Sequence, residues 1–246
     1  MRTPPELFRA AARLDPARPF LTFYDDVTGE RVELSYTTTD NWVAKTANLV
    51  IEDLGADPGE RVALFLPTHW QSVVIYLACW TAGVVAAPGA DPAHCAHAVA
   101  DPEHVEELAA CPGGRLLVPL RPMGARALEL PVGVLDYAAE VPAQPDRFHA
   151  APPPTAEDPA LDRDGTVFTA GQVVAAARQA AADLGLHAGS RLLVETDLAT
   201  AAGLSTALLA PLAVGASVVL CRNLDPAALA RRIEAERVTD RLLSTR

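Results

Sequence analysis

The chain has almost no lysine: of its 20 basic residues only Lys45 is lysine, and the rest are arginine. Any mechanism that needs a lysine as phosphate ligand, Schiff base or general base must therefore use Lys45 or do without one. Basic residues are also outnumbered by 31 acidic ones, which gives a formal net charge of −11. Nucleic acids and anionic membrane surfaces recruit basic patches, so this charge argues against both as partners and favours solubility.

Cysteine is scarce as well. The four cysteines show no CxxC spacing and no dense framework that would indicate disulfides: Cys79, Cys95, Cys111 and Cys221. This usage predicts a reduced, cytoplasmic setting. The first 20 residues contain no apolar core of the kind that a signal peptide has.

The sequence also lacks an unbroken membrane-spanning segment. Residues 198–221 carry no charge and are long enough to cross a bilayer, but Gly203, Pro211 and Gly215 interrupt them. We therefore expect a buried helix followed by a buried strand, and no membrane contact.

Common catalytic and metal motifs are missing too. No G-x-S-x-G or G-x-G-x-x-G motif occurs, which argues against a serine hydrolase and a dinucleotide-binding fold. Five histidine and cysteine residues, which are types that ligate metals, lie close together in the sequence: His94, Cys95, His97, His104 and Cys111. Their spacing matches no standard zinc site, so we interpret them as helix and loop surface and predict no metal.

What the chain does have is a long internal repeat. Residues 53–67 (DLGADPGERVALFLP) return at 183–197 as DLGLHAGSRLLVETD. In each copy a helix ends at a glycine, a short turn leads into a buried strand, and a second apolar helix ends at Gly83 or Gly215 before another strand. A repeat of this length indicates two similar supersecondary units that pack together.

Alternation of helices with apolar strands predicts an α/β fold. We expect two pseudo-repeated βαβ-type units that form mostly parallel sheets covered by helices. The first unit, 1–141, begins with a helix capped by Thr3 and a β-hairpin. A proline-rich linker or loop at 142–160 separates it from a second unit at 161–246.

Taken in order, several segments resemble the N-terminal domain of the adenylate-forming superfamily: acyl-CoA synthetases, luciferases and peptide-synthetase adenylation domains. They include ELFRAAARLDPARPFL, GERVALFLPTHWQSVVIYLACWTAGVVAAP and GLSTALLAPLAVGASVVL. The resemblance covers nearly the whole chain, which looks like an actinobacterial member, but only about the first half of a family enzyme. It implies activation of a carboxylate with ATP, and makes ATP, AMP and CoA the candidate ligands.

The resemblance also implies a Ser/Thr/Gly-rich loop ending in Pro-Lys-Gly that cradles the ATP phosphates just before the second repeat. Residues 157–174 read EDPALDRDGTVFTAGQVV, in which the family's lead-in and lead-out are present and the loop between them is missing. Asp162 and Asp164 stand there and would repel a triphosphate. An aromatic and a histidine expected after the second repeated strand are also replaced, and later family motifs would fall beyond Arg246. We therefore predict a degenerate, truncated member that has no catalytic residues for adenylation.

Candidate ligand-binding residues follow the repeated strands, because parallel sheets commonly bind ligands at that edge. The first copy supplies Thr68, His69 and Trp70, and the second supplies Thr196, Asp197 and Thr200. The structural alternative is that Thr68 caps the following helix while Trp70 packs, and that Asp197 caps the corresponding helix.

Three functions stay open at this point. The first is a binding or interaction module for a small acyl or nucleotide ligand or a protein, with a homodimer or partner covering the truncated edge near Arg246. The second is a half-synthetase, completed in trans by another chain, that activates a carboxylate with ATP to an acyl-adenylate or acyl-CoA. The third is a structural remnant without a ligand.

Overall fold

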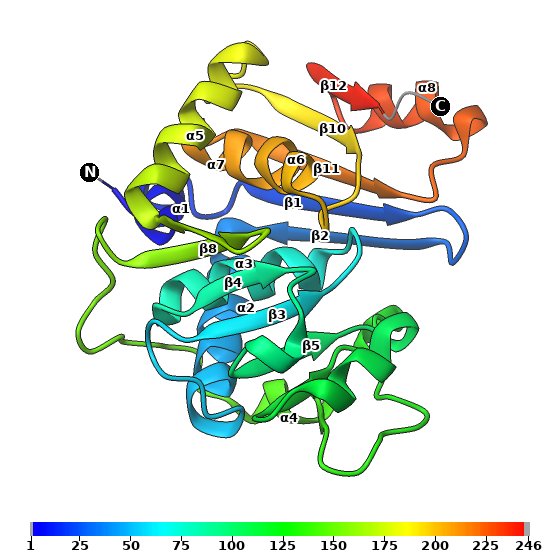
Figure 1. The fold of residues 1–246 in the computed structure, drawn as a ribbon. Coiled ribbons are helices and arrows are strands. Elements are labelled where there is room, and N and C mark those ends of the chain that lie inside the picture. The colour runs from blue at the N-terminus through cyan, green and yellow to red at the C-terminus, as the bar shows by residue number, and fades with distance from the viewer. Residues whose placement is uncertain (1, 244–246) are drawn as a thin grey trace.

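Two β-sheets lie one above the other in a computed structural model that describes residues 2–243 (Figure 1). Sheet A has the order β12-β10-β11-β1-β2 and contains β1 (Pro19–Asp25), β2 (Glu30–Ser35), β10 (Arg191–Glu195), β11 (Ser217–Arg222) and β12 (Asp240–Leu243). Sheet B has the order β7-β6-β5-β3-β4-β8-β9 and contains β3 (Arg61–Phe65), β4 (Val85–Pro88), β5 (His97–Ala100), β6 (Arg115–Leu117), β7 (Leu135–Asp136), β8 (Pro159–Arg163) and β9 (Thr166–Thr169).

Helices connect and cover these strands. The α-helices are α1 (Pro4–Leu14), α2 (Tyr36–Asn48), α3 (Trp70–Ala82), α4 (Tyr137–Glu140), α5 (Ala170–Asp183), α6 (Ala201–Gly203), α7 (Ala210–Val214) and α8 (Pro226–Ala235). Two π-helical segments, η1 (Leu49–Asp53) and η6 (Leu204–Leu209), continue α2 and join α6 to α7. The 3₁₀ helices are η2 (Pro92–His94), η3 (Pro102–Ala110), η4 (Pro122–Gly124) and η5 (Val141–Ala143). The prediction of an α/β fold with mostly parallel sheets covered by helices is confirmed.

The internal repeat is visible in the strand order of the two sheets. The series β5-β3-β4-β8-β9 in sheet B corresponds, strand for strand, to β12-β10-β11-β1-β2 in sheet A. Each copy consists of a hairpin, a helix, a strand, a second helix and a second strand. The hairpin of the first copy pairs in sheet A with the strands of the second copy, and the hairpin of the second copy pairs in sheet B with the strands of the first. Strand β1 pairs in parallel with β11, and β8 pairs in parallel with β4. Both sheets are therefore built from chain segments on both sides of residues 142–160.

The segment 144–158 contains no helix or strand and lies against α2. The ammonium group of Lys45 donates to the carbonyl oxygens of Pro142 (3.2 Å) and Gln144 (2.5 Å), and lies 3.0 Å from a carboxylate oxygen of Asp146. The amide of Asn48 donates to two further carbonyl oxygens of the same segment. The only lysine of the chain thus fastens this proline-rich segment to α2. The domain boundaries at 142 and 160 stay a prediction.

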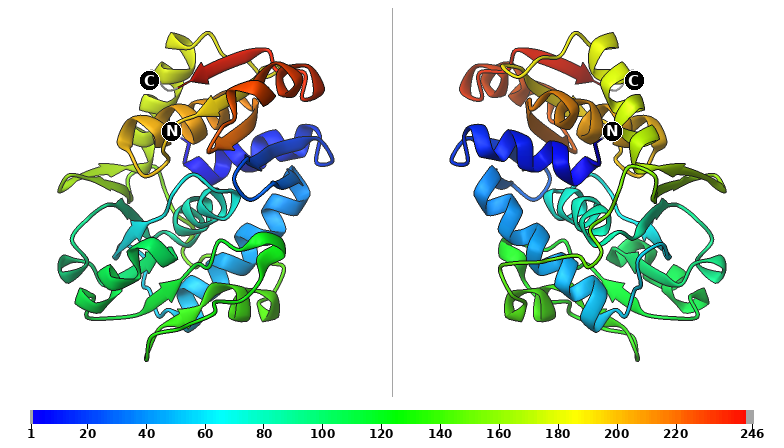
Figure 2. Two further views of the ribbon diagram at one scale, coloured as in Figure 1. Left: turned by 90° about the vertical axis from the view of Figure 1, so that its right-hand side faces the viewer. Right: turned by 90° about the vertical axis from the view of Figure 1, so that its left-hand side faces the viewer.

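Strand side chains alternate between a shared core and two outer ones, as the pleat requires. Leu192 in sheet A and Val62 in sheet B face the shared core, in which all of α3 is buried. Their neighbours Leu193 and Ala63 face outward, where α8 covers sheet A and η3 covers sheet B. Figure 2 shows α3 in the middle of the molecule, with α1 and α2 along one side.

Predicted helix ends are confirmed where a local signal sets them. Thr3 and Glu6 form the capping box that opens α1, and Gly83 and Gly215 end α3 and α7 in the left-handed conformation (φ 77° and 71°). Residues 201–221 form helix and then strand, and no helix of the described residues is long and apolar enough to cross a membrane. The predicted interaction edge near Arg246 lies outside the described residues.

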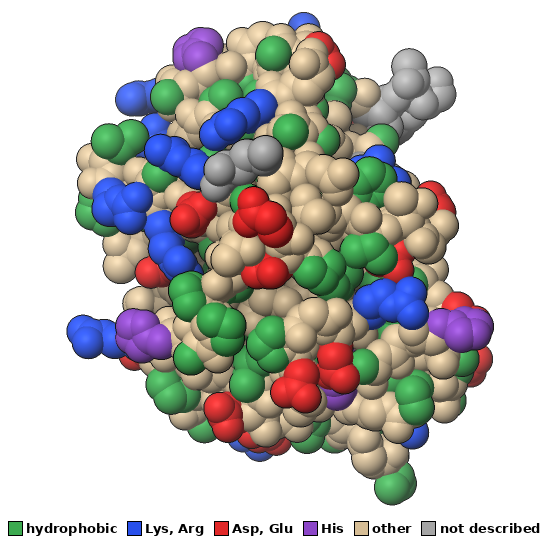
Figure 3. Space-filling model, turned by 60° about the vertical axis from the view of Figure 1, so that its left-hand side comes forward, with side chains coloured by type: hydrophobic (Ala, Val, Ile, Leu, Met, Phe, Trp, Pro, Cys, Tyr) green, Lys and Arg blue, Asp and Glu red, His purple; other side chains and the backbone are tan. Residues whose placement is uncertain are grey.

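Side chains of all kinds lie on the face drawn in Figure 3. On the face drawn in Figure 3, basic, acidic and hydrophobic side chains are interspersed, and the basic ones lie mainly over the upper half. The acidic excess of the sequence is therefore spread over this face and not gathered in one field.

Candidate functional site at the strand ends

A hollow of about 270 Å³ lies at the carboxyl ends of β3, β10 and β11, where the two sheets meet. Its lining residues are Pro67, Thr68, Glu195, Thr196, Asp197, Cys221, Arg222 and Asn223. Three of the six predicted site residues, Thr68, Thr196 and Asp197, are therefore brought together from the two repeats. The carboxyl edge of parallel strands is the usual place for ligands in open α/β sheets.

Thr68 links the two sheets at this hollow. Its hydroxyl donates to the carbonyl oxygen of Thr196 (2.6 Å) and accepts from the amide of Leu198 (3.1 Å). The expectation that Thr68 caps the next helix is wrong, because the Nδ1 atom of His69 accepts from the amide of Gln71 and caps α3 instead. The hydroxyl of Thr68 is thus already engaged with protein backbone, so a bound phosphate would have to displace these contacts.

The turn between β10 and α6 is held by its own polar groups. The carboxylate of Asp197 accepts from the amide of Ala199, and the hydroxyl of Thr200 accepts from the amide of Gly203 (3.0 Å). Thr200, and not Asp197, therefore caps the helix, and Thr200 does not line the hollow. A Cβ atom on Gly203 would lie 1.9 Å from the carbonyl oxygen of Asp197, so only glycine permits this close approach.

The remaining two predicted residues, His69 and Trp70, do not line the hollow. The imidazole of His69 is 2% exposed, packs on the ring of Phe23 with centroids 4.5 Å apart, and places Nε2 3.6 Å from a carboxylate oxygen of Glu30. Burial lowers the pKa of His69, although Glu30 acts in the opposite direction. Because Nδ1 accepts a backbone hydrogen bond, the ring is neutral with its proton on Nε2. Trp70 packs edge-to-face on Trp42 and does not line the hollow.

Other lining residues were not predicted. Cys221 and Arg222 end β11, and Asn223 follows it. A guanidinium nitrogen of Arg222 lies 3.7 Å from a carboxylate oxygen of Glu103. Burial raises the pKa of the Cys221 thiol to about 11, so this thiol is not a nucleophile at neutral pH. The sequence contained a signal for Arg222 and Asn223, because both directly follow the predicted buried strand SVVLC, as Thr68 and Asp197 follow the repeated strands.

The position of the expected phosphate loop is occupied by a tight hairpin. Strands β8 and β9 are joined by two residues only, Asp164 (φ 51°) and Gly165 (φ 79°), whose positive φ angles are those of a type I′ turn. The carboxylate of Asp162 pairs with the guanidinium of Arg61 at 3.0 Å. The junction thus contains neither a long loop of free amides nor a lysine that could hold phosphates.

Some of the clustered histidines and cysteines that were predicted to lie on the surface are in fact buried. Cys95, His97 and Cys111 are buried, so their assignment to exposed helix and loop is wrong. His97 bonds to the carboxylate of Glu60 through Nε2 (3.1 Å) and accepts from the amide of Gly114 through Nδ1. The ring of His97 therefore links the turn before β6 to Glu60, which directly precedes β3. Within residues 2–243 no group of three or more metal-ligating side chains could hold an ion.

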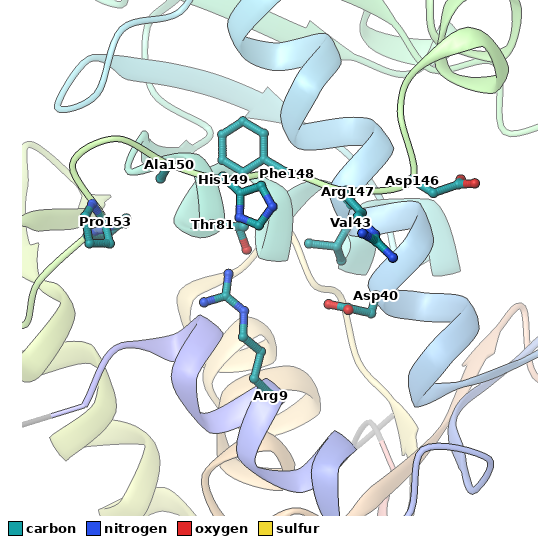
Figure 4. A pocket seen from close by; sticks show the side chains of 12 residues that line it. Arg9, Asp40, Val43, Thr81, Asp146, Arg147, Phe148, His149, Ala150 and Pro153 are labelled. Carbon is teal, nitrogen blue, oxygen red and sulfur yellow. The ribbon is translucent and has the colours of Figure 1, made fainter.

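A cavity of about 420 Å³ lies elsewhere, between α1, α2 and the segment 146–154. In Figure 4, Arg9 of α1 points toward His149, while Asp40 of α2 and Arg147 face one another across the opening. No residue of this cavity was predicted as a site residue, because its wall is a segment without periodic pattern.

Comparisons with known proteins agree with this architecture. A family model described as "AMP-binding enzyme" matches residues 8–105. A Mycobacterium tuberculosis protein named "TIGR03089 family protein" is 40% identical over 233 residues, 92% of each chain. A feruloyl-CoA synthase of an Amycolatopsis species is 30% identical over 227 residues, which are 84% of this chain and 42% of that protein. An acyl-CoA synthetase of Brucella canis has the same fold, with a TM-score of 0.78, 21% identity and coverage of 98% of this chain and 47% of that one.

The chain therefore belongs to the AMP-binding, adenylate-forming superfamily and, within it, to the family of the mycobacterial protein. It spans about half the length of the acyl-CoA synthetases that it matches, in the portion that corresponds to their N-terminal domain.

Proposed function

We propose that this chain does not form acyl-adenylates by itself and acts as a binding or interaction module built on the adenylating scaffold. The observation that supports this most strongly is the two-residue turn between β8 and β9. Transfer of an adenylyl group requires that the triphosphate be held by amides and positive charge, and this turn offers neither.

The chemistry of the hollow supports the same proposal. Its side chains include the carboxylates of Glu195 and Asp197 and one guanidinium, that of Arg222. The Thr68 hydroxyl is engaged with backbone and the Cys221 thiol is buried and protonated. Such a lining suits a small ligand with donor groups better than a polyphosphate, whose charge the carboxylates would repel.

The test is carboxylate-dependent exchange of pyrophosphate into ATP, with ferulate among the carboxylates because a similar protein is a feruloyl-CoA synthase. We expect no exchange by the purified chain under conditions in which a feruloyl-CoA synthase is active. Robust exchange by the chain alone would contradict the proposal. Exchange that appears only after a second polypeptide is added would support a half-synthetase completed in trans.

A further inference from the structure

A third, smaller pocket of about 210 Å³ lies between β2, α2 and the first turn of α3. Its walls are formed mainly by Glu30, Val32, Trp42, Trp70, Gln71 and Val141. Apolar and aromatic surface dominates this lining, and its two polar side chains, Glu30 and Gln71, present hydrogen-bond acceptors. It shares no lining residue with the hollow at the strand ends.

Glu30 is a buried carboxylate without a cationic partner. Its side chain is 8% exposed, and no lysine or arginine of residues 2–243 forms an ion pair with it. Its contacts are the indole N–H of Trp70 at 3.4 Å and the neutral ring of His69 at 3.6 Å, both long for hydrogen bonds. The carboxylate lies beside Trp70 at the amino end of α3, where the helix dipole attracts negative charge. Burying a carboxylate in this way costs free energy of folding unless a group of opposite charge pairs with it.

The same pocket offers two further groups that suit a cation which carries N–H donors. The rings of Trp42 and Trp70 meet edge-to-face with centroids 5.2 Å apart, and tryptophan is the side chain that attracts organic cations best. Gln71 is 2% exposed, and its amide oxygen has no hydrogen-bond partner among the described residues. A ligand N–H is the group that satisfies such an orphaned acceptor.

We propose that this pocket binds a small organic ammonium ion, with the carboxylate of Glu30 as counter-ion, the indoles of Trp42 and Trp70 as its aromatic wall and the amide of Gln71 as an acceptor. The carboxylate substrates implied by the superfamily have the opposite charge. The site is therefore independent of the hollow at the strand ends and of the proposed function.

The experiment titrates the full chain with benzylamine, benzyl alcohol and benzoate, which differ at the polar group while keeping the ring. Binding is read from tryptophan fluorescence, because two of the three tryptophans line the pocket and Trp80 is buried elsewhere. We expect benzylamine to bind at least about tenfold more tightly than benzyl alcohol, as a charge-assisted hydrogen bond implies, and benzoate not to bind. Equal binding of the alcohol or the carboxylate, or no binding of the amine, overturns the proposal.

Variants separate the site from a general charge effect. Glu30→Gln keeps the shape and removes the charge, so benzylamine should lose about tenfold in affinity while benzyl alcohol is unchanged. Glu33→Gln is the matched control on the same strand, where the carboxylate contacts Arg31 and Thr22 instead, and it should bind the amine normally. Trp42→Phe should retain more binding than Trp42→Leu, since it keeps an aromatic face. If Glu30→Gln folds and binds the amine as the unchanged protein does, the assignment of Glu30 is wrong.

Discussion

At the scale of single residues, the hydroxyl of Thr68 joins the two sheets through the carbonyl of Thr196 and the amide of Leu198. Thr68 and Asp197 follow repeated strands, and both reach the same hollow. Their roles depend on which neighbouring atom each side chain meets, and this is set by packing between the two sheets. Thr68 was expected to cap α3 but joins the two sheets instead, and His69 is the residue that caps α3. No pattern within one copy of the repeat contains that information.

Replacement of Thr68 by valine tests the link between the sheets. Thr68→Val keeps the shape and leaves the carbonyl of Thr196 and the amide of Leu198 without their partner, so we expect a loss of about 1–3 kcal/mol in the free energy of unfolding. Urea denaturation measures it. Thr166→Val, at an exposed strand position, is the control and should change the value by less than about 0.5 kcal/mol. If Thr68→Val lowers the free energy of unfolding no more than Thr166→Val does, the hydrogen bonds of Thr68 do not contribute to stability.

At the scale of secondary-structure elements, the ends of helices were the most predictable feature. Gly83 and Gly215 end helices through their own backbone conformation, which is local. The covering of the outer face of sheet A by α8 was not predictable, since it depends on distant pairs. Arg232 of α8 pairs with Asp26, and Glu236 bonds to Tyr24, Arg31 and Arg191 on three strands.

We expect these pairs to make the attachment of α8 dependent on pH. Burial opposes ionisation of Glu236, but hydrogen bonds from Tyr24, Arg191 and Arg31 hold its pKa below the ordinary value of 4.5. A lowered pKa in the folded state gives stability that is present above the unfolded value and is lost as pH falls. We therefore expect the free energy of unfolding to drop as pH falls through and below about 4.5.

Urea denaturation between pH 7 and pH 3 measures this dependence. Glu236→Gln should be less stable at pH 7 and should show a flatter dependence on pH, because the titrating group is gone. Glu234→Gln, exposed on the same helix, should retain the slope of the unchanged protein. A Glu236→Gln protein with the original slope would show that other carboxylates cause the acid sensitivity.

At the scale of the whole molecule, the repeat predicted the fold class but not the exchange of hairpins between its copies. Hydrophobic patterns identify each strand, whereas strand order depends on pairings far apart in the sequence, such as Leu21 with Val218. As a result neither sheet is formed by one copy alone. Sheet A contains β1 and β2 from the first copy, and sheet B contains β8 and β9 from the second.

Separate halves should therefore depend on each other for folding. We expect fragments 1–150 and 151–246 to be unfolded or insoluble when expressed alone, since the first lacks β8 to complete sheet B and the second lacks β1 beside β11. Co-expression should yield a soluble complex with the circular dichroism of the intact chain. A fragment that folds cooperatively by itself would contradict this, and a chain cut at one exposed site in 146–151 that stays associated would support it.

The pairing of β1 with β11 also has a consequence for synthesis on the ribosome. β1 emerges first, with Phe23 and Leu21 destined for full burial, but its parallel neighbour is translated about 195 residues later. At about 5–20 residues per second this corresponds to a delay of roughly 10–40 s. During that time the hairpin can bury only the face that α1, α2 and α3 cover, and its free edge can pair with the edge of another nascent chain. A chaperone that shields this edge during translation would therefore increase the yield of folded protein more than one that acts after release.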